Sequence, residues 1–156
     1  MNRYVVIATP DELPLIERFP EYLSWPVIVT GAGAMNVIQA LRDIPRDSAI
    51  VNIGYAGSVD IPVGSVVKVG VVTTYHPIAP VFETPLALDF GSGDIHCYTS
   101  TDFVTQAKRK GCVYDMELAF IASLGFRSLQ AIKVVSDHCD MTEYVETIIK
   151  NPVKKG

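Results

Sequence analysis

Two aspartates and a histidine follow directly on an apolar run in the segment AIKVVSDHCD, residues 131–140. Asp140 stands three residues before Glu143, the spacing of a helix capping box, so we predict a structural role for Asp140. Asp137 has no such explanation. A partly desolvated carboxyl group at a strand end has a raised pKa and can carry a proton near neutral pH. Asp137 is therefore either a candidate general acid or simply the polar residue at which a strand ends.

Glu117 is the second candidate, because it is the only charged residue between Met116 and Arg127. It falls where a helix is predicted to begin. One interpretation is a carboxylate that favours the positive end of the helix dipole. The other is a carboxylate at the mouth of a sheet that accepts hydrogen bonds from the hydroxyl groups of a ligand. The residues alone leave both open.

The glycine-containing segment VTGAGAMN, residues 29–36, resembles half of a dinucleotide fingerprint but lacks its third glycine. It is either a tight strand-to-helix turn or a turn that also borders a ligand. No nicotinamide cofactor is expected, and no other cofactor is implied. The histidines and cysteines show no metal-ligand spacing, so we expect no metal, and three buried thiols. These residues are His76, His96, His138, Cys97, Cys112 and Cys139.

The composition narrows the class of protein. The chain has 156 residues, of which 49% are hydrophobic, which predicts one domain over residues 1–156 with a substantial core. A net charge of −4 argues against nucleic acid and acidic membranes as partners. No apolar run is long enough to cross a bilayer and no signal peptide is visible, so we expect a cytoplasmic protein.

Strand and helix patterns alternate along the chain, and this alternation predicts an α/β fold with a largely parallel sheet covered on both faces. Helix patterns extend over residues 34–44, 102–110, 117–125 and 140–150, and residues 77–94 are predicted to form a loop or irregular hairpin. Gly70 marks a candidate β-bulge. The predicted strands are 3–9, 25–33, 48–57, 64–76, 96–100, 112–116 and 129–137.

Six segments, in order, resemble motifs of the nucleoside phosphorylase and nucleosidase family, in particular the methylthioadenosine/S-adenosylhomocysteine nucleosidases. The resemblance extends from residue 1 to about residue 140 and implies a three-layer α/β/α fold with a central mixed, largely parallel sheet. The segments are VTGAGAMN, IVNIGYAGSVD, GSVVKVGVVTTYH, YTSTDFV, VYDMELAFIA and VVSDHCD.

The resemblance implies a set of contacts to a purine base. Asp137 would protonate N7 of the purine and so make the base a better leaving group, and Ser136 would orient Asp137. Phe103 would stack on the base, and the backbone of Val104 would bind its edge.

The resemblance also implies contacts to the sugar. Met116 and Glu117 would line the ribose, with Glu117 binding its hydroxyl groups, and Ala56 and Gly57 would complete the substrate-binding set. Cleavage of an N-glycosidic bond passes through an oxocarbenium-like sugar, so a carboxylate near the ribose and an acid at the leaving group both serve this chemistry.

Three departures concern the nucleophile. An ungapped comparison places Leu13 opposite the family's water-activating glutamate, and Glu12 takes that role after a shift of one residue. No arginine lies in the glycine turn or near Gly57 to hold phosphate. Tyr55 replaces a small residue and is expected to crowd the sugar or phosphate site. The chain is also shorter than its relatives around residues 77–95 and after residue 140.

The function predicted from the sequence is hydrolytic cleavage of purine nucleosides. The alternatives are a phosphate-dependent nucleoside phosphorylase and a non-catalytic protein that binds purines or nucleosides. The expected partners are a nucleoside or purine and, for the phosphorylase, phosphate. The loop that contains Phe82 resembles a segment that reaches into a neighbouring subunit, which implies a homo-oligomer, most simply a dimer.

Overall fold

The computed structural model describes residues 2–75, 87–89, 93–105 and 107–150. The strands are β1 (Arg3–Ile7), β2 (Val27–Val29), β3 (Ala49–Gly57), β4 (Val66–Thr74), β5 (Ala87–Asp89), β6 (Ile95–Thr99), β7 (Cys112–Asp115) and β8 (Ser128–Asp137). The helices are α1 (Leu13–Ile16), α2 (Ala34–Leu41), α3 (Leu118–Ser123) and α4 (Met141–Tyr144). Two 3₁₀ turns, Pro10–Glu12 and Pro20–Tyr22, flank α1, and a π-helical segment, Val145–Lys150, continues α4.

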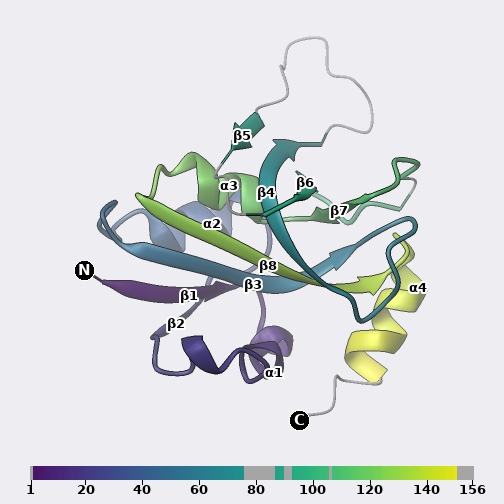
Figure 1. The fold of residues 1–156 in the computed structure, drawn as a ribbon, viewed down its shortest axis with the longest axis horizontal. Helices are drawn as coiled ribbons and strands as arrows, with labels where there is room; N and C mark the ends of the chain where they lie inside the picture. The colour runs from purple at the N-terminus through teal and green to yellow at the C-terminus, as the bar shows by residue number, and fades with distance from the viewer. Residues whose placement is uncertain (1, 76–86, 90–92, 106, 151–156) are drawn as a thin grey trace.

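The strands form one mixed sheet in which parallel pairs predominate (Figure 1). The parallel pairs are β1–β2, β1–β3, β3–β8, β4–β6 and β6–β7, and the antiparallel pairs are β3–β7, β4–β5 and β4–β8. The pairings β3–β8–β4–β6–β7–β3 close on themselves, with β8 between β3 and β4. The mixed, largely parallel sheet expected from the sequence is confirmed.

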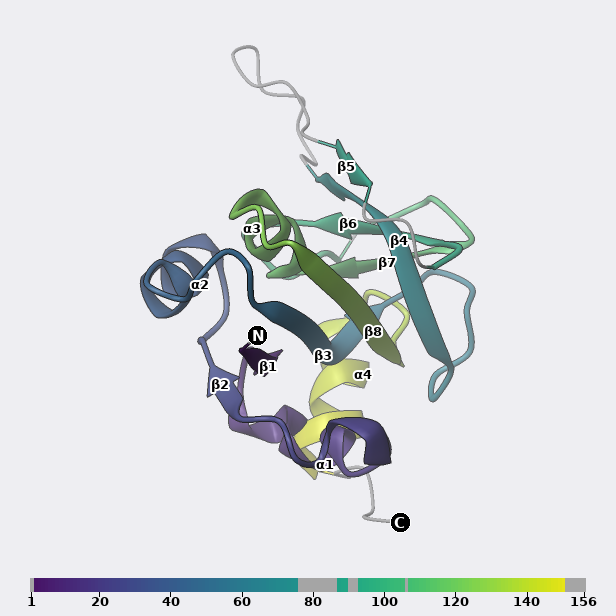
Figure 2. The same ribbon diagram turned by 60° about the vertical axis from the view of Figure 1, so that its left-hand side comes forward.

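Helices cover both faces of the sheet, as Figures 1 and 2 show. Alternate residues of β1 divide between two apolar clusters, because successive side chains of a strand point to opposite faces. Val6 packs with α2 and α3, through a cluster that includes Val37, Leu41 and Ile121. Val5 and Ile7 pack on the other face, in a cluster that includes Leu15, Ile16 and Ile148. The three-layer α/β/α architecture is confirmed.

The central strands β3 and β8 are buried along most of their length, which explains their nearly continuous apolar sequences. Polar residues in such strands need internal partners. Asn52 on β3 donates through Nδ2 to the Val6 carbonyl at 3.0 Å. The buried polar residues of β8 are Lys133, Ser136 and Asp137, and all three lie at or beneath the pocket described below.

Some predicted elements were wrong or too long. Residues 102–105 and 107–110 do not form the predicted helix, because tertiary contacts override the local pattern. Phe103 packs against Tyr144 and the guanidinium of Arg109 lies over the Tyr98 ring. The strand predicted over 25–33 is limited to β2, and β5 falls inside the predicted 77–94 loop. The rest of that loop from 77 to 86, with Phe82, and His76 lie outside the described residues.

Other local predictions are confirmed. The pairing of β4 with β6 shifts register between Val69 and Val71, which is the bulge expected at Gly70. Cys97, Cys112 and Cys139 are buried free thiols. No helix within the described ranges is long and apolar enough to span a membrane.

The predicted cap of the terminal helix is confirmed in part. Asp140 caps α4 by accepting hydrogen bonds from the backbone N–H groups of Thr142 and Glu143, at 2.8 and 3.2 Å. The Glu143 carboxylate does not complete the capping box at Asp140. It accepts instead from the His138 backbone N–H and lies 3.2 Å from His138 Nδ1, and so ties α4 to the end of β8.

Candidate active site

The carboxyl ends of β1, β3, β7 and β8 meet at a pocket. Ligands of open α/β sheets bind at this edge. All nine residues that the sequence assigned to a site lie in its wall. The lining residues are Ala8, Thr9, Glu12, Ala32, Tyr55, Ala56, Gly57, Phe103, Val104, Tyr114, Asp115, Met116, Glu117, Ser136, Asp137, Cys139 and Tyr144.

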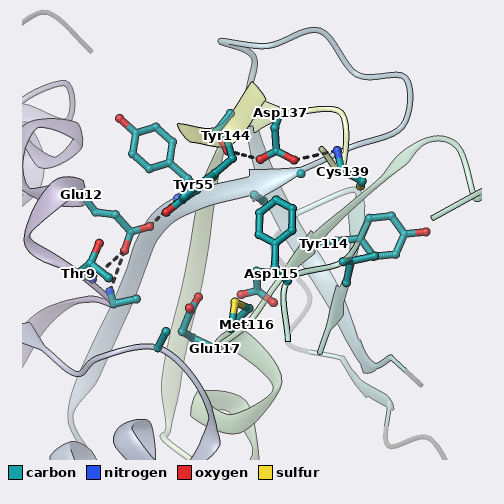
Figure 3. Close-up of a pocket in the computed structure, with 17 residues that line it drawn as sticks. Thr9, Glu12, Tyr55, Tyr114, Asp115, Met116, Glu117, Asp137, Cys139 and Tyr144 are labelled. Carbon is teal, nitrogen blue, oxygen red and sulfur yellow. Dashed lines mark hydrogen bonds between the residues drawn. The ribbon is translucent and has the colours of Figure 1, made fainter. Parts of the chain in front are cut away.

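Besides Asp115, three carboxyl groups line this pocket, and they occupy three separate corners of it (Figure 3). Glu12 enters from the turn after β1, Glu117 from the start of α3, and Asp137 from the end of β8. Their exposed fractions are 6%, 7% and 1%. Because buried carboxyl groups are costly to ionise, each of the three can hold or exchange a proton at a pH where a surface carboxylate cannot.

Asp137 is held by its immediate neighbours. The Ser136 hydroxyl donates to Oδ2 at 2.7 Å, and the Cys139 N–H donates to Oδ1 at 2.8 Å. Cys139 adopts a positive φ of 63° at this turn. Burial raises the pKa of Asp137, and these two hydrogen bonds offset part of the rise. A Cβ at Gly57 would come within 2.8 Å of Oδ1, so only glycine leaves room for this carboxyl group.

Glu12 is held by backbone amides of two elements. Its Oε1 accepts from the Ala8 and Thr9 N–H groups at 2.8 and 3.4 Å, and its Oε2 accepts from the Tyr55 N–H at 2.7 Å. Burial raises its pKa, while the charge of Lys133 and the amides oppose the rise. The side chain of Leu13 is 44% exposed and does not line the pocket, so the ungapped placement of Leu13 is wrong.

The turn that carries Glu12 was missed from the sequence, although a signal for it was present. Thr9 and Glu12 have the Thr-x-x-Glu spacing of a capping box, with Pro10 at the first helical position. That pattern predicts a helical turn that directs the Glu12 carboxylate back to the amides at its start. Ala32, in the glycine turn after β2, also lines the pocket, so this turn borders the site.

A buried ion pair beneath the pocket was also missed. Lys133 is fully buried, with Nζ 2.9 Å from Asp115 Oδ2 and 4.0 Å from Glu117 Oε2. Asp115 also accepts from the Thr99 hydroxyl at 2.5 Å and the Leu118 N–H at 2.9 Å. Burial alone would raise the pKa of Asp115, but Lys133 and these donors hold it below its usual value. Asp115 is therefore the permanently charged partner of Lys133.

Glu117 lies between these charges and the pocket. Burial and, next, the neighbouring charge of Asp115 raise its pKa to about 8, although Lys133 opposes the rise. Glu117 stands at the N-cap of α3 without making a capping hydrogen bond through its side chain. The side chain is therefore not used to cap the helix, and its carboxyl group is available to a ligand.

The wall between the carboxyl groups is largely apolar. Phe103 and Tyr144 meet edge to face, with ring centroids 5.4 Å apart, and Val104, Met116 and Ala56 also line the pocket. Such a wall fits an aromatic base. The backbone and ring of Tyr55 also border the site. Its ring packs into the apolar cluster under α1.

No protein-family model and no curated protein matches the sequence. Solved structures do match. The 5′-methylthioadenosine/S-adenosylhomocysteine nucleosidase (MTAN) of Helicobacter pylori aligns with a TM-score of 0.71 and 14% identity, over 97% of this chain and 93% of that chain. The MTAN of Chlamydia trachomatis aligns with a TM-score of 0.75 and 22% identity, over 99% of this chain and 93% of that chain. The futalosine hydrolase of Helicobacter pylori aligns with a TM-score of 0.70 and 14% identity, over 97% of this chain and 92% of that chain.

This chain has the nucleosidase fold. The structural likeness confirms the fold that the six sequence motifs implied. In this fold, the six motifs lie on β2, β3, β4, β6, β7 and β8 or in the turns that follow these strands. No group of His, Cys, Asp and Glu side chains among the described residues could hold a metal ion.

Gly54 offers a test of the site geometry. A Cβ at this position would lie 2.6 Å from Glu12 Oε2 and 3.4 Å from Lys133 Nζ. We expect Gly54→Ala to displace the Glu12 carboxylate and to lower kcat/KM by about tenfold or more, at a stability cost of about 1–3 kcal/mol. Steady-state kinetics and thermal unfolding measure the two effects. In a Glu12→Gln background the kinetic effect should largely vanish; a full additional tenfold loss there contradicts the coupling.

The raised pKa of Glu117 predicts a pH dependence of stability. The folded state keeps the proton up to about pH 8, whereas the unfolded chain releases it near the ordinary value of 4.5. This contribution is therefore complete below pH 4.5 and is lost as pH rises to about 8. We expect the melting temperature of the wild-type protein to fall over this pH window, and that of Glu117→Gln to fall less steeply. If calorimetry gave the same slope of melting temperature against pH for both proteins, the raised pKa of Glu117 would be contradicted.

Proposed function

We propose that this protein hydrolyses the N-glycosidic bond of purine nucleosides. The observation that carries the proposal is the placement of three buried carboxyl groups around one apolar pocket. Asp137 and Glu12 lie at separate corners, and Glu117 lies at a third. Glycosidic cleavage needs an acid for the leaving group, a base for the attacking water and negative charge near the sugar, and this set supplies all three.

The leaving-group half of the reaction uses the end of β8. The base stacks on Phe103, and the backbone of Val104 binds its edge. Asp137, protonated because burial raises its pKa, donates its proton to N7 of the purine. The electron pair of the breaking C1′–N9 bond then moves into a neutral base rather than an anion. Ser136 keeps the Asp137 carboxyl group in position through its 2.7 Å hydrogen bond.

The sugar half uses the other two carboxyl groups. Glu117 accepts hydrogen bonds from the ribose hydroxyl groups, with Met116, Ala56 and Gly57 around the sugar. Glu12 accepts a proton from the attacking water, whose oxygen bonds to C1′. The Glu12 carboxylate also favours the positive charge that develops on the sugar as the bond to the base breaks, whereas Glu117 holds its proton below about pH 8. The three amides that hold Glu12 fix its orientation before the substrate binds.

Hydrolysis is favoured over phosphorolysis by the charge of the pocket. Within the described part of the chain, no arginine or lysine lines it, and the ammonium of Lys133 lies beneath the floor, paired with Asp115. A phosphate ion would face three carboxyl groups without a cation to bind it. Water carries no such penalty.

The solved neighbours support the same chemistry. The H. pylori nucleosidase was solved with a pyrrolidine-based nucleoside analogue, and an Asp→Asn variant of it with 5′-methylthioadenosine in the active site. A single nucleosidase domain over residues 1–156 remains part of the proposal. A homodimer remains a prediction, because Phe82, on which it rests, lies outside the described residues.

Base release tests the proposed function. The protein is incubated with adenosine, inosine, methylthioadenosine and S-adenosylhomocysteine, with and without phosphate, and free base is measured by chromatography. We expect free base to be released in the absence of phosphate. Release only with phosphate would make the protein a phosphorylase. No release from any substrate, together with saturable binding in a thermal-shift titration, would make it a nucleoside-binding protein.

A further inference from the structure

Two phenol side chains, Tyr55 and Tyr144, line the pocket without a task in the chemistry above. Tyr144 comes from α4 and packs against the apolar cluster that contains Tyr55. The side chain of Tyr55 is 8% exposed. Among the residues that the structure describes, neither phenol hydroxyl has a hydrogen-bond partner. A hydroxyl at a pocket wall loses its water when a ligand binds, and it is costly to leave unpaired unless the ligand completes its hydrogen bonding.

Charged groups act on the two phenols, although much of the pocket wall is apolar. Burial, followed by the charge of Glu12, raises the pKa of both Tyr55 and Tyr144 to about 12. The next charge that acts on Tyr144 is that of Asp11, ahead of Glu117 and Asp137. Both hydroxyls are therefore neutral donors and acceptors, rather than phenolates.

The stereochemistry of a nucleoside indicates which part of the substrate reaches Tyr144. In a β-nucleoside the base and C5′ project from one face of the ribose, and the 2′ and 3′ hydroxyls project from the other. Glu117 binds the hydroxyl face and Asp137 binds the base. In Figure 3, Tyr144 lies on the Asp137 side of the pocket, away from Glu117. The group on C5′ is thus directed towards Tyr144.

We propose that Tyr144, assisted by Tyr55, selects nucleosides whose 5′ group forms hydrogen bonds, such as the 5′-hydroxyl of adenosine, over nucleosides with an apolar 5′ group. This inference rests on the proposed function, because it takes the position of the base and ribose from it. A thioether or a methyl group at C5′ leaves both phenol hydroxyls unpaired, whereas a hydroxyl group can donate to one and accept from the other.

The test compares adenosine with 5′-deoxyadenosine, which differ only in the 5′-hydroxyl. We expect the wild-type protein to prefer adenosine in kcat/KM by about tenfold. Tyr144→Phe should bring the ratio close to one by slowing adenosine and leaving 5′-deoxyadenosine nearly unchanged, and Tyr55→Phe should lower it in part. Tyr22→Phe is the matched control, because its hydroxyl donates to Gln130 at 3.0 Å, outside the pocket, and its ratio should equal that of wild type.

The outcomes separate this inference from the proposed function. An unchanged ratio in Tyr144→Phe, or a wild-type preference for 5′-deoxyadenosine or methylthioadenosine, overturns the inference and leaves the hydrolase in place. If no substrate releases base, the proposed function fails, and dissociation constants from calorimetry replace kcat/KM. A tenfold tighter Kd for adenosine that Tyr144→Phe abolishes then supports the role of Tyr144. Equal Kd values, or no binding of either nucleoside, overturn it.

Discussion

Replacing Asp137 by asparagine is expected to lower kcat/KM for base release by about 10²–10⁴-fold, the usual contribution of a positioned general acid. The amide has nearly the same shape and can still accept from the Cys139 N–H, but it has no proton to transfer to N7. Substrate binding should survive, because Phe103, Val104 and Glu117 are untouched. Steady-state kinetics and calorimetric binding of adenosine measure the two properties separately.

The control for this variant lies three residues away. Asp140→Asn makes the same chemical change at the N-cap of α4, where asparagine caps as well as aspartate does. It should keep the activity and the melting temperature of wild type. If Asp137→Asn released base at the wild-type rate, the assignment of Asp137 as general acid would be wrong.

Replacing Lys133 by methionine is expected to destabilise the protein by about 3–5 kcal/mol, because the change leaves the carboxylate of Asp115 buried without its counter-charge. For a chain of this length, the melting temperature should fall by roughly 10 °C. Urea unfolding followed by circular dichroism gives the free energy directly. The side chain of Met fills a similar volume, so lost packing contributes little.

Two companion variants locate the cause. Lys68→Met removes an exposed lysine from neighbouring β4 and should change the free energy of unfolding by no more than about 0.5 kcal/mol. Asp115→Asn combined with Lys133→Met removes both charges, and this double variant should be more stable than Lys133→Met alone. A double variant that lost the sum of the two single effects would show that the pair does not act as a unit.

Much of the fold was predictable because its signals are local. The alternation of Val5 and Ile7 with Val6 places β1 between two layers, and the apolar runs of β3 and β8 are those of strands buried on both faces. The 102–110 segment failed for the opposite reason. Its conformation follows from contacts with distant residues, such as Tyr144, which no local pattern records.

The residues of the site also divide into those that could be predicted from the sequence and those that could not. Asp137 and Glu117 were predictable because a charged residue at the end of an apolar run has few structural explanations. Lys133 was overlooked, although it is the only charge inside the apolar run 131–135, and its partner Asp115 lies in another strand. A sequence shows that a buried charge needs a partner, but not which residue supplies it. The distance between Glu12 and its amides likewise depends on how β1 and β3 pair.

The insertion of β8 between β3 and β4 has a consequence for how the protein is made. Residues 128–137 are translated last among the strands, yet they pair with two strands that have left the ribosome on the order of 50 residues earlier or more. Until then, β3 and β4 each present an unpaired edge, a template for aggregation. Asp137 therefore reaches the pocket only in the step in which β8 closes this gap.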